Sequence, residues 1–137
     1  MRIRDKIKKP QRPVVAYEIL PPRQKDGTLN SYAETISSLL SQTHIDAINI
    51  PEVHDEAARG DRPVANQKRG EPREFGRLLQ DIVGIEAIVN RVVVHDSYEK
   101  QMQWLEETNV KYEIENMIIV GGESSKVEYP GPSVNQT

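Results

Sequence analysis

Glu18 is the residue of this sequence best placed to do chemistry, because it is a carboxylate inside a mostly apolar run. The run spans 14–20 and is stopped by Pro21 and Pro22, which indicates a buried strand, since proline has no N–H to extend a ladder. A carboxylate near the C-terminal end of such a strand is costly unless it is paired, hydrated or used, and functional sites of α/β proteins lie at that end. A desolvated carboxyl group can also donate a proton near neutral pH. Glu18 is therefore the first functional candidate of the sequence, as a group able to donate a proton, the alternative being a structural glutamate paired with an arginine.

Further candidates lie on, or directly after, later stretches that read as strands. They are Asn49, Asn90, His95, Gly121, Gly122 and Glu123. The two asparagines could hydrogen-bond the polar edge of a ring or satisfy neighbouring groups inside the fold, and His95 could contact a ligand or cap a loop. The two glycines permit close backbone approach to a ligand or form a plain turn, and Glu123 follows them.

Neither metal binding nor cysteine chemistry is predicted. The sequence has no cysteine, which excludes disulfides, thiolate metal sites and cysteine nucleophiles. The three histidines, His44, His54 and His95, lack a metal-ligand spacing such as H-x-x-x-H.

Hydrophobic periodicity and capping residues predict the elements that must position these side chains. Strands are expected over 14–20, 47–50, 85–94 and 116–120. Helices are expected over 31–42, from 71–72 onward and from 96–97 onward, because these starts have capping-box spacing or a proline in the first turn. The apolar residues expected to pack inward from them are Ile36, Leu39, Leu40, Phe75, Leu78, Leu79, Ile82, Met102, Trp104 and Leu105. The charged stretch 52–70 is expected to be a functional or disordered loop, and 129–133 to begin a fourth helix.

The alternation of strands and helices indicates an α/β protein built from parallel (β/α) units. The sequence has no G-x-G-x-x-G after its first predicted strand and no Walker loop, which argues against the nucleotide-binding doubly wound folds. The other parallel architecture is the (β/α)₈ barrel of about 250 residues. With 137 residues, the chain would supply the first half of such a TIM-type barrel.

Composition favours a single domain of the cytoplasm. The net charge of −3 and an apolar content of 36% give no sign of nucleic-acid binding, and no apolar run reaches the roughly 18 residues of a membrane span. The segment 1–13 is basic but has no apolar core behind it, so it is not a signal peptide. It is predicted to be a solvated lead-in, the alternative being a segment that contacts an anionic ligand or surface. Residues 14–137 are predicted to form one (β/α)₄ half-barrel domain.

The stretch Tyr17-Glu18-Ile19-Leu20-Pro21-Pro22-Arg23 resembles the opening strand of the methylenetetrahydrofolate reductase family, which reads aromatic-Glu-Phe-Phe-Pro-Pro. Later landmarks come in the same order. Asp46 precedes the second predicted strand, the third runs into Asp96, and the fourth ends in Val-Gly-Gly-Glu-Ser where the family has Leu-Arg-Gly-Asp. The resemblance spans nearly the whole chain and ends after the fourth strand.

This resemblance implies a flavin-dependent (β/α)₈ barrel that reduces methylenetetrahydrofolate, with FAD as cofactor and NAD(P)H as electron donor. Glu18 stands where the family's first-strand glutamate acts as general acid toward the folate, and Glu123 stands where its fourth-strand aspartate lies near the flavin and pterin. The sequence departs from the family at Pro51, Asn90 and Gly121, which replace a threonine, a histidine and an arginine. These departures favour the alternative of a flavin-free pterin-binding or methyl-transfer relative.

A half barrel also predicts a partner. A sheet of four strands would leave edges and an apolar face uncovered, so we expect a homo-oligomer or pairing with a second half-barrel chain. A third alternative is therefore a half barrel, or a fragment of a longer polypeptide, that is not catalytic by itself.

Overall fold

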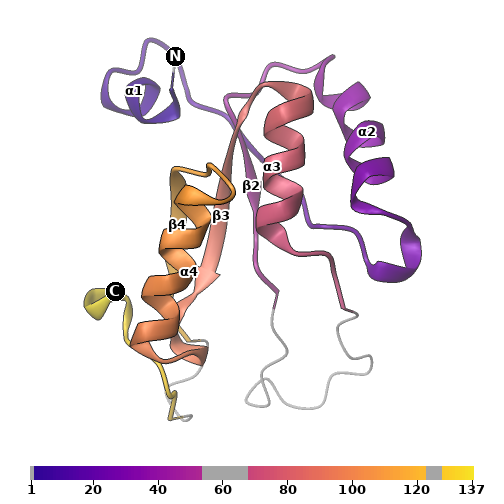
Figure 1. The fold of residues 1–137 in the computed structure, drawn as a ribbon. Helices are drawn as coiled ribbons and strands as arrows, with labels where there is room; N and C mark the ends of the chain where they lie inside the picture. The colour runs from indigo at the N-terminus through magenta and orange to yellow at the C-terminus, as the bar shows by residue number, and fades with distance from the viewer. Residues whose placement is uncertain (1, 54–67, 123–127) are drawn as a thin grey trace.

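The computed structural model describes residues 2–53, 68–122 and 128–137. In these residues, four parallel strands form one sheet whose order in space follows the order along the chain (Figure 1). The strands are β1 (Ala16–Glu18), β2 (Ala47–Ile50), β3 (Glu86–Val92) and β4 (Asn116–Val120). The predicted α/β class with parallel β/α units is thus confirmed. The described strands do not show the reversal of order that defines a doubly wound sheet.

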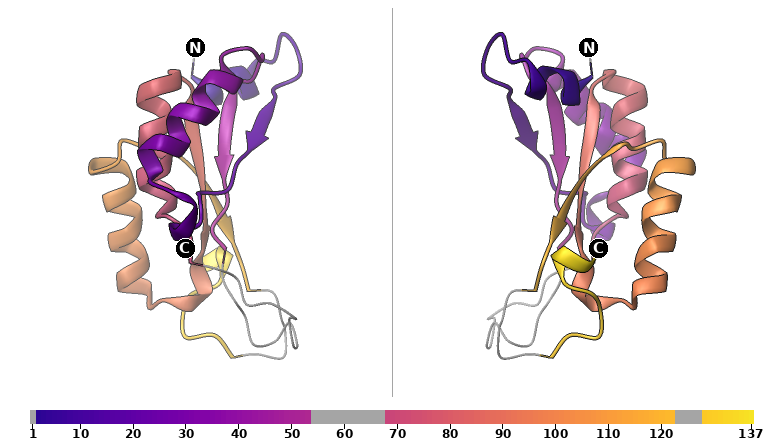
Figure 2. Two further views of the ribbon diagram at one scale, coloured as in Figure 1. Left: turned by 90° about the vertical axis from the view of Figure 1, so that its right-hand side faces the viewer. Right: turned by 90° about the vertical axis from the view of Figure 1, so that its left-hand side faces the viewer.

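Three helices cover one face of this sheet: α2 (Leu29–Leu40), α3 (Pro72–Val83) and α4 (Tyr98–Val110). Both views in Figure 2 show them on the same side of the strands. Each starts at a capping residue whose side chain accepts a backbone N–H, namely Thr28, Glu71 and Ser97. Such caps satisfy N–H groups that have no partner inside the helix.

The hydrophobic core lies between this helical layer and the sheet. Ile48 and Ile50 of β2 and Val89 of β3 are fully buried, and they pack with Phe75 and Leu79 of α3. Gly76 allows α3 to approach the sheet closely, since a Cβ there would lie 3.1 Å from side-chain atoms of both Ile50 and Ile114. The helix-covered face therefore behaves as an ordinary packed protein interior.

The opposite face of the sheet, here called the bare face, is not covered by α2, α3 or α4 (Figure 2). Side chains alternate between faces along a strand, so the residues between the core positions lie on it. They are Ala16, Glu18, Ala47, Asn49, Glu86, Ile88, Asn90, Val92, Asn116, Ile118 and Val120. Ile118 and Val120 are exposed, so part of this face is apolar and uncovered.

The basic segment at the start of the chain packs at the end of the sheet where the strands begin. Residues Ile3–Lys8 form helix α1, and the Ile3 side chain is buried. Lys6 and Arg12 both pair with Asp46, whose side chain is 1% exposed, and Asp46 also accepts the Val15 N–H at 2.9 Å. The prediction of a solvated tail is therefore wrong, because a buried carboxylate before β2 needs these cations.

Several predicted boundaries also need correction. The strand predicted over 14–20 is only Ala16–Glu18, all exposed, because β1 is an edge strand paired on one side. The first long helix starts after Thr28 instead of at Ser31, and β3 ends at Val92, where a 3₁₀ turn, η3 (Val93–His95), follows. The segment 129–133 leads into a single 3₁₀ turn, η4 (Val134–Gln136).

Three of the residues predicted to pack inward are exposed, namely Leu39, Ile82 and Met102. Each lies on the outer flank of its helix, where periodicity alone does not show how wide the contact with the sheet is. No helix in the described ranges combines the length and apolarity that crossing a membrane requires.

Candidate functional site

Glu18 and Asn49 form a hydrogen-bonded pair on the bare face. They are directly opposite each other in the register of β1 and β2, and Asn49 Nδ2 donates to Glu18 Oε2 at 3.1 Å. Glu18 is exposed, so the desolvation expected for it is absent in this structure. No arginine pairs with it in the described part of the chain, so the structural alternative of an ion pair is not observed there either.

Asn90 joins this pair on the same face. It lies on β3, two residues after Ile88, which is in register with Asn49. The Oδ1 atoms of Asn49 and Asn90 are both buried and have no hydrogen-bond partner in the described structure. A buried acceptor without a partner is costly, so these two oxygens mark a place where a ligand or another chain could supply N–H groups.

The other predicted site residues lie beyond the C-terminal end of the sheet. His95 is in η3, and its ring makes an edge-on contact with Tyr129 at 5.8 Å between centroids. A Cβ on Gly122 would lie 2.2 Å from the same tyrosine ring. The chain therefore packs its own Tyr129 where the sequence predicted close approach of a ligand to Gly121 and Gly122.

Glu123 lies outside the described residues. The structure thus brings together Glu18, Asn49 and Asn90 on the bare face, while His95, Gly121 and Gly122 pack with the C-terminal segment. Among the described residues, no group of His, Asp and Glu side chains is arranged to hold a metal ion.

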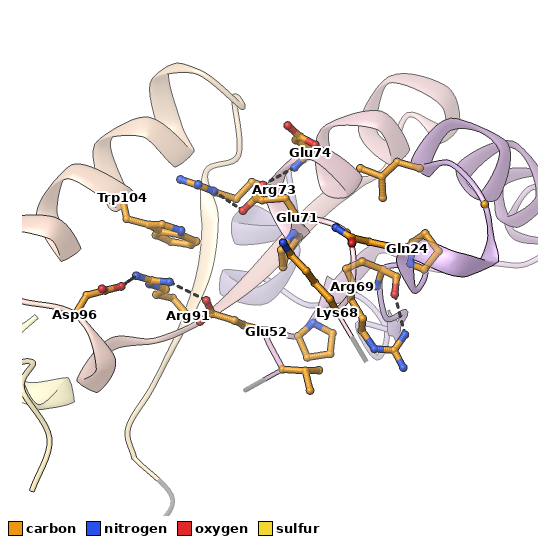
Figure 3. Close-up of a pocket in the computed structure, with 18 residues that line it drawn as sticks. Gln24, Glu52, Lys68, Arg69, Glu71, Arg73, Glu74, Arg91, Asp96 and Trp104 are labelled. Atoms are coloured by element: carbon orange, nitrogen blue, oxygen red, sulfur yellow. Dashed lines mark hydrogen bonds and ion pairs between the residues drawn. The ribbon is translucent and has the colours of Figure 1, made fainter. Parts of the chain in front are cut away.

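A second polar site, which sequence reasoning missed, is a cleft of about 1000 Å³ at the carboxyl ends of the strands (Figure 3). It does not include Glu18, Asn49 or Asn90 and lies toward the helical layer. Its charged lining is balanced, with four cations and four carboxylates among the described residues: Lys68, Arg69, Arg73, Arg91, Glu52, Glu71, Glu74 and Asp96. This balance does not favour a strongly anionic or cationic ligand.

Arg91 lies in the wall of that cleft. It is 8% exposed and donates to Glu52 Oε1 at 2.7 Å, to Asp96 Oδ2 at 2.5 Å and to Gln101 Oε1 at 3.1 Å. Its guanidinium carbon also lies 4.8 Å from the centroid of Trp104. Glu52 completes the arrangement by accepting the Val92 N–H at 2.7 Å, which ties the end of β2 to β3.

Trp104 lies between two arginines, as Figure 3 shows. Arg73 contacts it from the α3 side at 4.8 Å, the same distance as Arg91, and Arg73 also pairs with Glu71 and Glu107. Two cation–π contacts thus connect the Trp104 ring with both guanidinium groups. An arginine in an apolar strand, such as Arg91 between Asn90 and Val92, was the sequence signal that could have indicated this cleft.

No protein-family model matches this chain, and no curated protein matches it significantly.

Proposed function

We propose that this chain is half of a TIM-type (β/α)₈ barrel and works as a methylenetetrahydrofolate reductase-like, flavin-dependent oxidoreductase of the cytoplasm. The observation that carries the proposal is the position of Glu18, Asn49 and Asn90 together on the bare face of a sequentially ordered parallel sheet. In a barrel of this type the helices lie outside and the other face of the sheet turns inward. The three polar side chains would then face the interior, near the carboxyl ends of the strands.

The open edges of the sheet support a missing second half. β1 pairs only with β2, and β4 only with β3, within the described sheet. A (β/α)₈ barrel needs four further parallel strands between those edges. We propose that a second copy of the chain, or a second half-barrel chain, provides them and thereby also removes Glu18 from water.

The residues on the bare face fit the polar edge of a flavin or a pterin. Both rings carry N–H groups, and Asn49 Oδ1 and Asn90 Oδ1 are buried acceptors without partners in the described structure. FAD, re-reduced by NAD(P)H, would supply the hydride chemistry when bound. The chain itself would hold the folate by the two amides, exclude water, and deliver a proton from the Glu18 carboxyl group.

The test is a titration of the purified chain with FAD, followed by quenching of the flavin fluorescence, and then turnover with methylenetetrahydrofolate. We expect saturable binding in the micromolar range, and Glu18→Gln should retain that binding while losing about 100-fold in turnover or more. Glu86→Gln is the matched control, because Glu86 lies on the same face at the amino-terminal end. Unchanged turnover in Glu18→Gln would refute the catalytic role.

A flavin-free pterin-binding or methyl-transfer protein is the second candidate. Pro51 follows β2 where the resemblance implies a flavin-contacting threonine, and Tyr129 fills the space beside Gly122. Saturable binding of a folate in the absence of FAD, with no flavin binding at the same protein concentration, would favour this candidate over the reductase.

A further inference from the structure

We infer that Asn49 is the positioning residue for Glu18 and determines which carboxyl oxygen carries the transferable proton. This inference rests on the proposed function, because it concerns the same proton donor. It goes beyond that proposal by assigning a separate task to Asn49, which would otherwise count only as a ligand contact.

The position of Asn49 is fixed from both sides of its strand. Its backbone oxygen accepts the Ile19 N–H at 2.9 Å, and its other neighbour in the register is Ile88 of β3. Since Asn49 is directly opposite Glu18 in a parallel pair, the two side chains point from the same face at the spacing of neighbouring strands. The amide therefore meets the carboxyl group without bending either strand.

The orientation of the amide follows from the charges. Nδ2 donates to Glu18 Oε2 at 3.1 Å, whereas the reversed amide would place Oδ1 against a carboxylate oxygen, with repulsion between two acceptors. The observed orientation also explains why Asn49 Oδ1 is buried without a partner. One amide thus binds the acid through its nitrogen and presents its oxygen to whatever occupies the bare face.

This hydrogen bond makes the two oxygens of Glu18 unequal. In the neutral acid, the oxygen that accepts an N–H is the carbonyl oxygen, because it is a better acceptor than the hydroxyl oxygen. The proton is therefore carried on Oε1. During transfer the Oε1–H bond breaks, its electron pair stays on the carboxylate, and the proton forms a new bond to a basic nitrogen of the folate. The Asn49 N–H continues to donate to the ionised product.

The bare face offers a matched control for this pair. Asn116 Nδ2 donates to Glu86 Oε1 at 3.3 Å, so a second asparagine–glutamate pair lies between β3 and β4. Glu86 also accepts the Ile3 N–H at 2.5 Å, which ties it to α1. Glu86 and Glu18 are the titratable side chains that the described strands place on this face.

The first experiment compares the carbon-13 NMR resonances of the glutamate carboxyl groups at neutral pH in the wild-type chain, Asn49→Leu and Asn116→Leu. Leucine has a similar volume but no N–H, so the carboxyl group loses a hydrogen-bond donor and its carbon-13 chemical shift changes. We expect the Glu18 carboxyl resonance to move in Asn49→Leu only, and the Glu86 carboxyl resonance to move only in Asn116→Leu. Asn49→Asp, which also lacks the N–H donor, should move the Glu18 resonance as well.

The second experiment measures turnover of the same variants over a range of pH. We expect Asn49→Leu to lower kcat about ten-fold, with a smaller change in KM and a shifted pH profile, because the acid is misplaced rather than removed. If Glu18→Gln abolishes turnover while Asn49→Leu changes neither the Glu18 carboxyl resonance nor kcat, the role of Asn49 is refuted and the proposed function stands. If Glu18→Gln leaves turnover unchanged, the proposed function itself fails, whatever the NMR spectra show.

Discussion

The two faces of the sheet differ in how they satisfy the polar side chains of two consecutive residues of β3, Asn90 and Arg91. Arg91 points into the helix-covered face, where it has three hydrogen-bond partners and an aromatic neighbour. Asn90 points to the bare face, where its Oδ1 is buried without a partner in the described structure. Both are polar residues in a mostly apolar strand, yet only Arg91 has its hydrogen bonds completed by other described residues of the chain.

This difference distinguishes polar residues that stabilise the fold from polar residues whose presence the fold alone does not explain. A polar group whose partners are all supplied by the chain contributes to stability, and removing it leaves those partners unpaired. A polar group that lacks partners costs stability and is retained only if something else uses it. Mutations on the two faces should therefore differ in sign as well as in size.

The largest expected effect is on the helix-covered face, at Arg91. Arg91→Ala removes the buried guanidinium that donates to Glu52, Asp96 and Gln101, and should lower the free energy of unfolding by about 3 kcal/mol. Arg91→Lys keeps the charge but not the planar fork, so its loss should be smaller. Urea denaturation followed by circular dichroism measures both. A loss below about 1 kcal/mol in Arg91→Ala would show that the cleft network does not support the fold.

The next effect is the pH dependence of stability that comes from Asp46, at the end of the sheet where the strands begin. Hydrogen bonds from Arg12, from the Val15 N–H and from Lys6 hold the pKa of the Asp46 carboxyl group well below its usual range. The ordinary aspartate pKa is about 3.9, so the stabilisation is complete above that value and is lost as the pH falls toward the folded-state pKa. The free energy of unfolding should therefore decrease with decreasing pH below about 4.

Asp46→Asn is the variant that isolates this contribution. The slope of stability against pH gives the number of protons taken up on unfolding, and below pH 4 this number should be lower by up to about one in Asp46→Asn. Urea denaturation at a series of pH values measures the slope. Asp26→Asn is the control, because Asp26 forms an exposed pair with Arg23 and exposed pairs contribute little. Identical slopes in wild type and Asp46→Asn would contradict the assignment.

The smallest expected effect is on the bare face. Asn90→Leu removes a buried acceptor that has no partner in the described structure, so the free energy of unfolding should change by no more than about 0.5 kcal/mol and should tend to rise. Binding of a folate or flavin should weaken in the same variant. A loss of stability as large as that of Arg91→Ala would mean that the bare face is as fully packed as the covered one.

Sequence reasoning was most accurate where a local signal decides the structure. β2 and β4 begin and end where their apolar runs predicted, and α3 starts at Pro72 as its first-turn proline indicated. It was least accurate for β1, because an apolar run ending in two prolines cannot show that the strand lies at an edge. The burial of Ile3 and the pairing of Lys6 with Asp46 were missed for a similar reason: the partners are 40 residues apart in the second case.

For the candidate site, the residue types were predicted but their surroundings were not. The sequence showed Glu18, Asn49 and Asn90 as polar residues within predicted apolar strands. The observed strand register then placed all three on one face. No sequence pattern indicated that Asn49 binds Glu18, that Tyr129 packs beside Gly122, or that Trp104 lies between two arginines.

By itself, the sequence determined the class of the fold and the order of its elements, because periodicity, capping residues and prolines act through neighbours along the chain. Only the tertiary structure decided which face the helices cover, which strands lie at the edges, and which polar groups find partners. Those outcomes depend on contacts between residues far apart in sequence, such as Arg91 with Glu52 and Arg12 with Asp46. Their free energies arise only when the sheet brings the residues together.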